Sequence, residues 1–198
     1  MLEKETIGES DLQYKNITAR KAFEELPMQE LHTASIYRKG VSETNREFKE
    51  RIISRLENLG VFGTYVNKNT GWNIRFNSND AKSVLGHSPR EGKTALLQKV
   101  PQMIKNGIYL ETTPKNQQGL STDVFASRAN IDGTDYAIVY GVRNDGNGRR
   151  YYDHNLVDVI KVNEISSGAR PSGLTAAYET TPHVAPETLS DVLIKHLS

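Results

Sequence analysis

The stretch that most constrains the fold is a pair of strand-like segments, VFASRANI and TDYAIVYGVR, separated by Asp-Gly at 132–133. Asp-Gly between two such segments is a strong signal for a two-residue hairpin turn, because both central residues of that turn need a positive φ. The turn pairs Arg128 with Ala137 and Val124 with Gly141. The sequence therefore predicts a long antiparallel hairpin.

The two faces of this hairpin differ in character. One face is mostly apolar and is expected in the core; it carries Phe125, Ala129, Ile131, Tyr136, Ile138, Tyr140 and Val142. The other face places Arg128 above Ala126 and Ala137, with Arg143 further along. A long cation above small side chains forms a shallow recess that a phosphate could enter. An ordinary arginine on the open face of a sheet is the alternative interpretation.

The segment RRYYDH at 149–154 supplies the next strand, and its register depends on the turn before it. A two-residue turn at 145–146 is the pairing that the Asp-Gly signal favours, and it brings Tyr152 and His154 to the recess face. A longer loop reverses the faces and brings Tyr151 and Asp153 there instead, because side chains alternate along a strand.

Patterning elsewhere predicts a domain over 42–162. A helix is expected over 42–60, because Thr44 and Glu47 have capping-box spacing. Further strands are expected at 63–68, 72–77, 108–113 and within 149–162, with a second helix that Pro101 kinks and that ends near 106. Helices packed on an antiparallel meander of these strands give an α+β fold. Residues 1–41 are expected to form an N-terminal arm, and 163–198 a linker with a short C-terminal helix.

The segment GHSPREGKT at 86–94 ends in Gly-Lys-Thr, as phosphate-binding loops do. Those loops need four residues between the first glycine and the Gly-Lys pair, whereas this segment has five. Ser88, Pro89 and Glu91 instead have the spacing of a capping box with proline at the first helical position. The segment therefore predicts the start of a helix, with His87 and Lys93 near its positive end, where anions bind.

The charge balance limits how the chain can bind a polyanion. The 25 Lys+Arg against 24 Asp+Glu leave a net charge of +1, and residues 61–162 carry 13 basic and 9 acidic residues, a surplus of four. That surplus is small for a protein that neutralises many phosphates, and it fits a compact site for few of them.

The composition argues against a metal site, a membrane span and a signal peptide. The chain has no cysteine and no His-Glu-x-x-His spacing, so we expect neither a metal nor another cofactor. No run reaches the roughly 18 apolar residues of a membrane span, and the N-terminus lacks the features of a signal peptide. We therefore expect a protein that does not associate with membranes. It is expected either in the cytoplasm of its own cell or in that of another cell, into which a larger polypeptide delivers it.

The sequence at 45–162 resembles the large-polyvalent-protein-associated nuclease domain of phages and mobile elements. The segments that carry the resemblance are GTYVNKNTGWNIRF with DAKSVLGH, ALLQKVPQMIKNGIYL, and VFASRANIDGTDYAIVYGVRND leading into YYDH. That family is placed with the fold group of barnase, EndoU, colicin nucleases and RelE. The resemblance implies helices on a four-stranded antiparallel sheet and a metal-independent ribonuclease, with no fixed catalytic set to carry across.

The leading hypothesis is RNA cleavage by transfer to the adjacent 2′-hydroxyl. His87 and His154 are the candidate base and acid, Arg128 and Lys82 the candidates to stabilise the phosphate, and Tyr152 the candidate to stack a base.

Arg143 and Lys93 are further candidate substrate contacts. The expected partner is RNA, with tRNA among the candidates, and an immunity or inhibitor protein is a second. The rival hypothesis is a protein-interaction module that keeps the fold and lacks catalysis. The oligomeric state is left open.

Overall fold

The computed structural model describes residues 19–32, 37–86, 91–113, 120–145 and 147–162, with the backbone alone at 91–93 and 154–158. The linker and C-terminal helix expected at 163–198 lie outside the described residues. So do His87 and the expected helix cap at Ser88.

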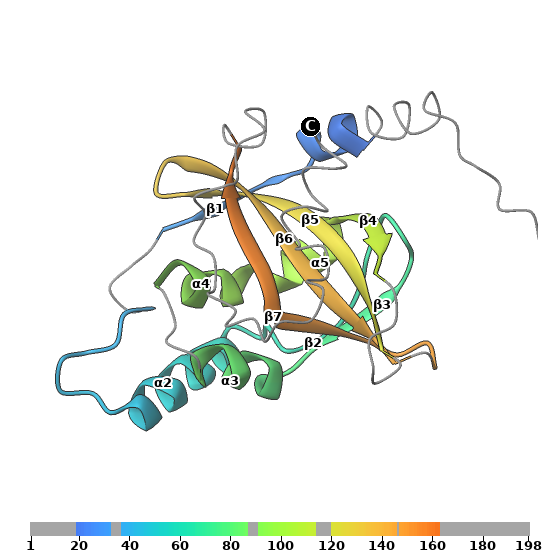
Figure 1. The fold of residues 1–198 in the computed structure, drawn as a ribbon. Coiled ribbons are helices and arrows are strands. Elements are labelled where there is room, and N and C mark those ends of the chain that lie inside the picture. Colours follow the sequence, from blue (N-terminus) through green and yellow to red (C-terminus); the bar gives the residue numbers. More distant parts are fainter. Residues whose placement is uncertain (1–18, 33–36, 87–90, 114–119, 146, 163–198) are drawn as a thin grey trace, which may run out of the picture.

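The fold is built on a seven-stranded mixed sheet of order β1-β5-β6-β7-β3-β2, with β4 also paired to β5 (Figure 1). Its strands are β1 Met28–Leu31, β2 Gly63–Val66, β3 Asn73–Phe76, β4 Ile108–Thr112, β5 Ser121–Ile131, β6 Thr134–Asn144 and β7 Arg150–Lys161. The α+β class is confirmed. The expected antiparallel sheet of about four strands is wrong, because β1 runs parallel to β5 and β3 parallel to β7.

Helices cover one face of the sheet, here called the inner face. They are α2 Asn45–Asn58, α3 Ser78–Gly86, α4 Glu91–Leu96, the 3-10 turn η2 Leu97–Lys99 and α5 Val100–Asn106. The expected capping box begins α2: the Thr44 side chain accepts from the Glu47 N–H, and the Glu47 carboxylate accepts from the Thr44 N–H. The second expected helix is present as α4, η2 and α5, with Pro101 in the first turn of α5.

The β5–β6 hairpin has the predicted register throughout. Asp132 and Gly133 adopt φ values of 49° and 84°, as a two-residue turn requires, and Arg128 pairs with Ala137. Asn130 reinforces the turn by accepting from the Gly133 N–H at 2.9 Å. Local turn chemistry therefore fixes this part of the sheet.

The β6–β7 register follows the longer-loop alternative, and the favoured two-residue turn is wrong. Asp145 Oδ1 accepts from the N–H groups of Asn147 and Arg149, so the side chain organises a wider loop that pairs Asn144 with Arg150. Tyr152 consequently faces the interior. Further along, the pairing shifts by several residues after Asp153, which makes β7 irregular there.

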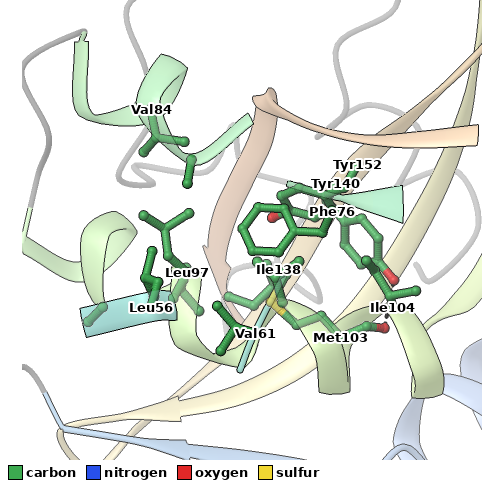
Figure 2. Packing of buried hydrophobic residues seen from close by; sticks show 14 of the residues in the cluster. Leu56, Val61, Phe76, Val84, Leu97, Met103, Ile104, Ile138, Tyr140 and Tyr152 are labelled. Atoms are coloured by element: carbon green, nitrogen blue, oxygen red, sulfur yellow. Dashed lines mark hydrogen bonds between the residues drawn. The ribbon is translucent and has the colours of Figure 1, made fainter. Parts of the chain in front are cut away.

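The main core lies between the inner face and the helices (Figure 2). The Tyr152 ring contacts both Phe76 and Tyr140, with ring centroids 5.4 Å apart in the first pair and 5.5 Å apart in the second. Leu56 of α2, Leu97 and Ile104 pack against the same cluster. Large apolar side chains on alternate strand positions and on one stripe of each helix account for this layer.

The opposite face, here called the outer face, is divided into two halves. One half is an apolar patch covered by residues 19–26, with Phe23 only 4% exposed. The strand side chains of this patch are Ile108, Leu110, Val124, Ala126, Ala137, Val139 and Ile160. Residues 19–31, which lie in the expected N-terminal arm, therefore pack on the sheet. No other described segment covers the second half of the outer face, which we call the open half.

Candidate functional site

A straight row of side chains crosses five strands on the open half of the outer face. Strand pairing aligns Thr64 with Arg75, Arg75 with Tyr151, Tyr151 with Arg143, and Arg143 with Thr122. Directly paired residues point to the same side of a sheet, so two arginines flank one tyrosine. With strands about 4.8 Å apart, the guanidinium-bearing positions lie about 10 Å apart and the whole row spans about 19 Å. We call these five residues the arginine row.

The cations of the arginine row are accessible. Arg75 is exposed and forms no hydrogen bond or ion pair with another described residue. Arg143 is also exposed, and its Nη2 donates to Asp153 Oδ2 at 2.5 Å. Tyr151, half-buried between them, has a hydroxyl group without a partner among the described residues. The row therefore offers two guanidinium groups and one aromatic ring to a ligand.

Two carboxylates border the row, that of Asp153 on β7 and that of Asp80 at the start of α3. Asp153 is 8% exposed, and Asp80 caps α3 by accepting from the Asn77 N–H at 2.8 Å. Burial raises the pKa of Asp80, the Asn77 N–H opposes that shift, and the negative charge of Asp153 adds to it. The positive charges of Arg75 and Arg143 lower the same pKa, so Asp80 senses the charges of both arginines and of Asp153.

A buried ion pair on the inner face anchors the strand that carries Tyr151. Arg150 Nε donates to Asp123 Oδ2 at 2.8 Å, and Thr112 Oγ1 donates to Asp123 Oδ1 at 2.6 Å. The Arg150 guanidinium also lies 3.7 Å from the centroid of the Trp72 ring. These contacts hold the first residues of β7 against β3 and β5, and so fix the position of Tyr151.

Arg128 does not lie on an open face, contrary to expectation. Its Nη1 donates to the Glu24 carbonyl oxygen at 2.6 Å, and its guanidinium lies 5.8 Å from the Phe23 ring centroid. Arg128 Nε is buried without a partner, which costs roughly 1–3 kcal/mol. The reason is that residues 19–26 pack over this part of the outer face, which strand patterning did not reveal.

The structure does not bring the predicted phosphate contacts together. Arg128 pairs with Ala137, six residues before Arg143 on β6, which separates the two arginines by roughly 20 Å along the sheet. Lys82 instead lines a groove of about 670 Å³ between α2 and α3, facing Lys49 and Glu50 among others.

The remaining predicted site residues divide between the core and the residues not described. Tyr152 is 1% exposed in the main core, so its ring is not available to stack a base. His154 follows Asp153 in the irregular part of β7, and its side chain is not described; the same holds for Lys93 in α4. The catalytic roles assigned to the histidines stay predictions.

Three members of the arginine row, Thr64, Arg75 and Thr122, were not predicted from the sequence. Arg75 lies in NIRF, where alternation with Ile74 and Phe76 already placed it away from the core. Tyr151 was named only in the alternative register. Their alignment depends on the parallel pairing of β3 with β7, for which the sequence carries no local signal.

Among the described residues, no group of three or more His, Asp or Glu side chains is arranged to hold a metal ion. No helix within those residues is long and apolar enough to cross a membrane.

Comparison with known proteins identifies a family for the chain. No curated protein and no solved structure matches the chain. A family model described as Large polyvalent protein-associated domain 3 matches residues 43–152, more than half of the chain. This match confirms the polyvalent-protein part of the resemblance, whereas nuclease activity stays a prediction. The chain belongs to the family of Large polyvalent protein-associated domain 3.

Proposed function

We propose that this domain binds single-stranded RNA across the open half of its outer face. The observation that carries the proposal is the arginine row, in which Arg75 and Arg143 flank Tyr151 on three adjacent strands. Proteins that bind single strands combine cations that follow the phosphates with aromatic rings on which bases stack. The row supplies both at one place.

The chemistry of the row suits a strand whose phosphates and bases alternate. Each guanidinium can donate two parallel hydrogen bonds to a phosphate, and Tyr151 can stack on the base between them. A site with two phosphate contacts also agrees with the surplus of only four positive charges in 61–162. Such a site predicts a weak salt dependence. The logarithm of the binding constant should fall with the logarithm of the salt concentration with a slope of about −1.4, because each of the two phosphate contacts contributes about −0.7.

Fluorescence anisotropy with a labelled oligouridylate of about 16 nucleotides tests the proposal at low salt. Arg75→Ala is the sharpest variant, because Arg75 is exposed and has no described partner whose loss would disturb the fold. We expect weaker binding and a salt slope smaller in magnitude by about 0.7. Tyr151→Ala should cost roughly 1–3 kcal/mol of binding free energy.

Arg46→Ala is the matched control, because it removes the same charge from an exposed position on α2. It should leave the affinity and the salt slope unchanged. Equal losses in Arg75→Ala and Arg46→Ala would show that binding is nonspecific and would refute the arginine row as the site. Absence of RNA binding by the wild-type protein would favour a protein-interaction module.

Metal-independent cleavage of the bound RNA is a second candidate. The observation that favours it is the presence of two proton-transfer groups, Tyr151 and Asp153, beside Arg143 on the same face. Transfer to the 2′-hydroxyl needs a base, an acid and positive charge at the phosphate.

The cleavage test is incubation with RNA in EDTA, with DNA of the same sequence as the control. Cyclic-phosphate products from RNA alone would support cleavage, and Tyr151→Phe should then slow it without loss of binding. Intact RNA under conditions where anisotropy shows it bound would leave binding as the function. We also propose cytoplasmic RNA, tRNA included, as the nucleic-acid partner and an immunity or inhibitor protein as a second partner; the support for both is the resemblance to the nuclease domain.

A further inference from the structure

The covered half of the outer face is filled by a short segment of the same chain. Residues 19–24 form a helical segment and Met28–Leu31 form β1, which pairs with only four residues of β5. Figure 1 shows this segment in blue along the far edge of the sheet from α2 and α3. The segment lies before residue 43, where the match to the family begins. We call residues 19–31 the cover.

The cover places an oxygen atom on Arg128 where an anion could bind. The Glu24 carbonyl oxygen sits 2.6 Å from Arg128 Nη1, at the place where a phosphate oxygen would accept the same hydrogen bond. A carbonyl oxygen is a weaker partner for a guanidinium than an ionised oxygen is. Arg128 Nε is buried and has no partner, so the cover satisfies this cation incompletely.

The covered site and the arginine row lie on one continuous face. Arg128 is on β5 and pairs with Ala137 of β6, and Arg143 follows on the same side of β6. Ala126, Val139 and Gly141, which lie between them on β5 and β6, have small or apolar side chains. The described negative charge beside this path is that of Asp153 on β7, which faces Gly141 and is paired with Arg143. A strand bound at the row could extend along β6 toward Arg128 once the cover is displaced.

We propose that Arg128 forms a cryptic phosphate site, which the cover occupies and a longer bound RNA strand uncovers. The proposal rests on RNA binding at the arginine row. Because the cover and the phosphate use the same guanidinium, each weakens the binding of the other by the same factor. RNA of sufficient length should therefore loosen residues 19–31, and fixing the cover should weaken RNA binding.

A disulfide that locks the cover tests the proposal. The chain has no cysteine, and Glu30 and Asn130 are directly paired between β1 and β5, with Cα atoms about 5 Å apart as a disulfide requires. In Glu30→Cys/Asn130→Cys we expect the reduced form to bind the labelled oligouridylate at least fivefold more tightly than the oxidised form. Asn130→Cys alone is the control, since Asn130 supports the hairpin turn, and it should not respond to oxidation.

Arg128→Ala in the same double-cysteine background separates this proposal from the previous one. It should weaken RNA binding in the reduced form and have no effect in the oxidised form, whereas Arg75→Ala should weaken binding in both. Equal affinity of the oxidised and reduced forms, with Arg128→Ala silent in each, overturns the cryptic site and leaves the arginine row intact. A silent Arg75→Ala overturns the arginine row itself.

Hydrogen exchange of the wild-type protein checks the same point without any substitution. Saturating RNA should speed amide exchange in residues 19–31 and slow it or leave it unchanged in β6. Slower exchange in residues 19–31 on RNA binding would mean that the cover is part of the bound state, which contradicts the proposal.

Discussion

Removal of Arg150 should destabilise the domain far more than removal of an exposed arginine. In Arg150→Met, Asp123 keeps only the hydrogen bond from Thr112 and stays 1% exposed. Loss of one partner from a buried pair typically costs about 3–5 kcal/mol, because the remaining charge is buried without compensation. The Arg150 side chain is 16% exposed, so we expect the lower end, about 3 kcal/mol.

The matched control is Arg46→Met. Arg46 Nε also lies 2.8 Å from a carboxylate, that of Glu50, but the Arg46 side chain is 86% exposed. Exposed pairs contribute less than about 1 kcal/mol, since water already solvates both charges. The two arginines thus compare the same interaction at different burial.

Urea denaturation followed by far-UV circular dichroism measures both costs. Asp123→Asn removes the charge of the partner. Combined with Arg150→Met, it should reduce the destabilisation that Arg150→Met causes, because no buried charge is then left unpaired. Equal costs for Arg150→Met and Arg46→Met, or a double variant no better than Arg150→Met alone, would refute the view that the buried pair anchors β7.

Two other predictions concern packing and pH. Gly107→Ala should lower the free energy of unfolding by about 1–3 kcal/mol, because a Cβ atom would overlap the Tyr140 hydroxyl and lie 2.8 Å from the Met103 carbonyl oxygen. Tyr140→Phe removes that hydroxyl, so it should destabilise the Gly107→Ala variant less than it destabilises the wild type. Equal destabilisation in urea denaturation would contradict the overlap. The Arg51 side chain, and then the Gly40 N–H, lower the pKa of Glu43 from 4.5 to about 2. A lowered pKa contributes stability that is fully present above pH 4.5 and is mostly lost at pH 2, where half of the Glu43 carboxylates of the folded protein are protonated. Glu43→Gln should therefore lower Tm clearly near neutral pH and only slightly at pH 2, and a Tm difference independent of pH would contradict this.

Elements that depend on neighbouring residues were predictable from the sequence. The β5–β6 register follows from Asp132-Gly133, and the start of α2 follows from Thr44 and Glu47. In both, the interacting groups are a few residues apart, so the local chain alone determines the geometry. The β6–β7 turn shows the limit of such reasoning: the Asp145 side chain stabilises a wider loop than its Asp-Gly dipeptide predicts.

The candidate site depended on contacts between distant parts of the chain. Arg75 and Tyr151 meet only because β3 pairs in parallel with β7, and Arg128 is covered only because residues 19–31 return to β5. Such pairings are selected by burial of whole sheet faces, which no short segment encodes. The sequence by itself determined which side chains alternate away from the core; the tertiary structure alone decided which of them lie side by side and which are covered, because strand order and edge pairing are properties of the assembled sheet.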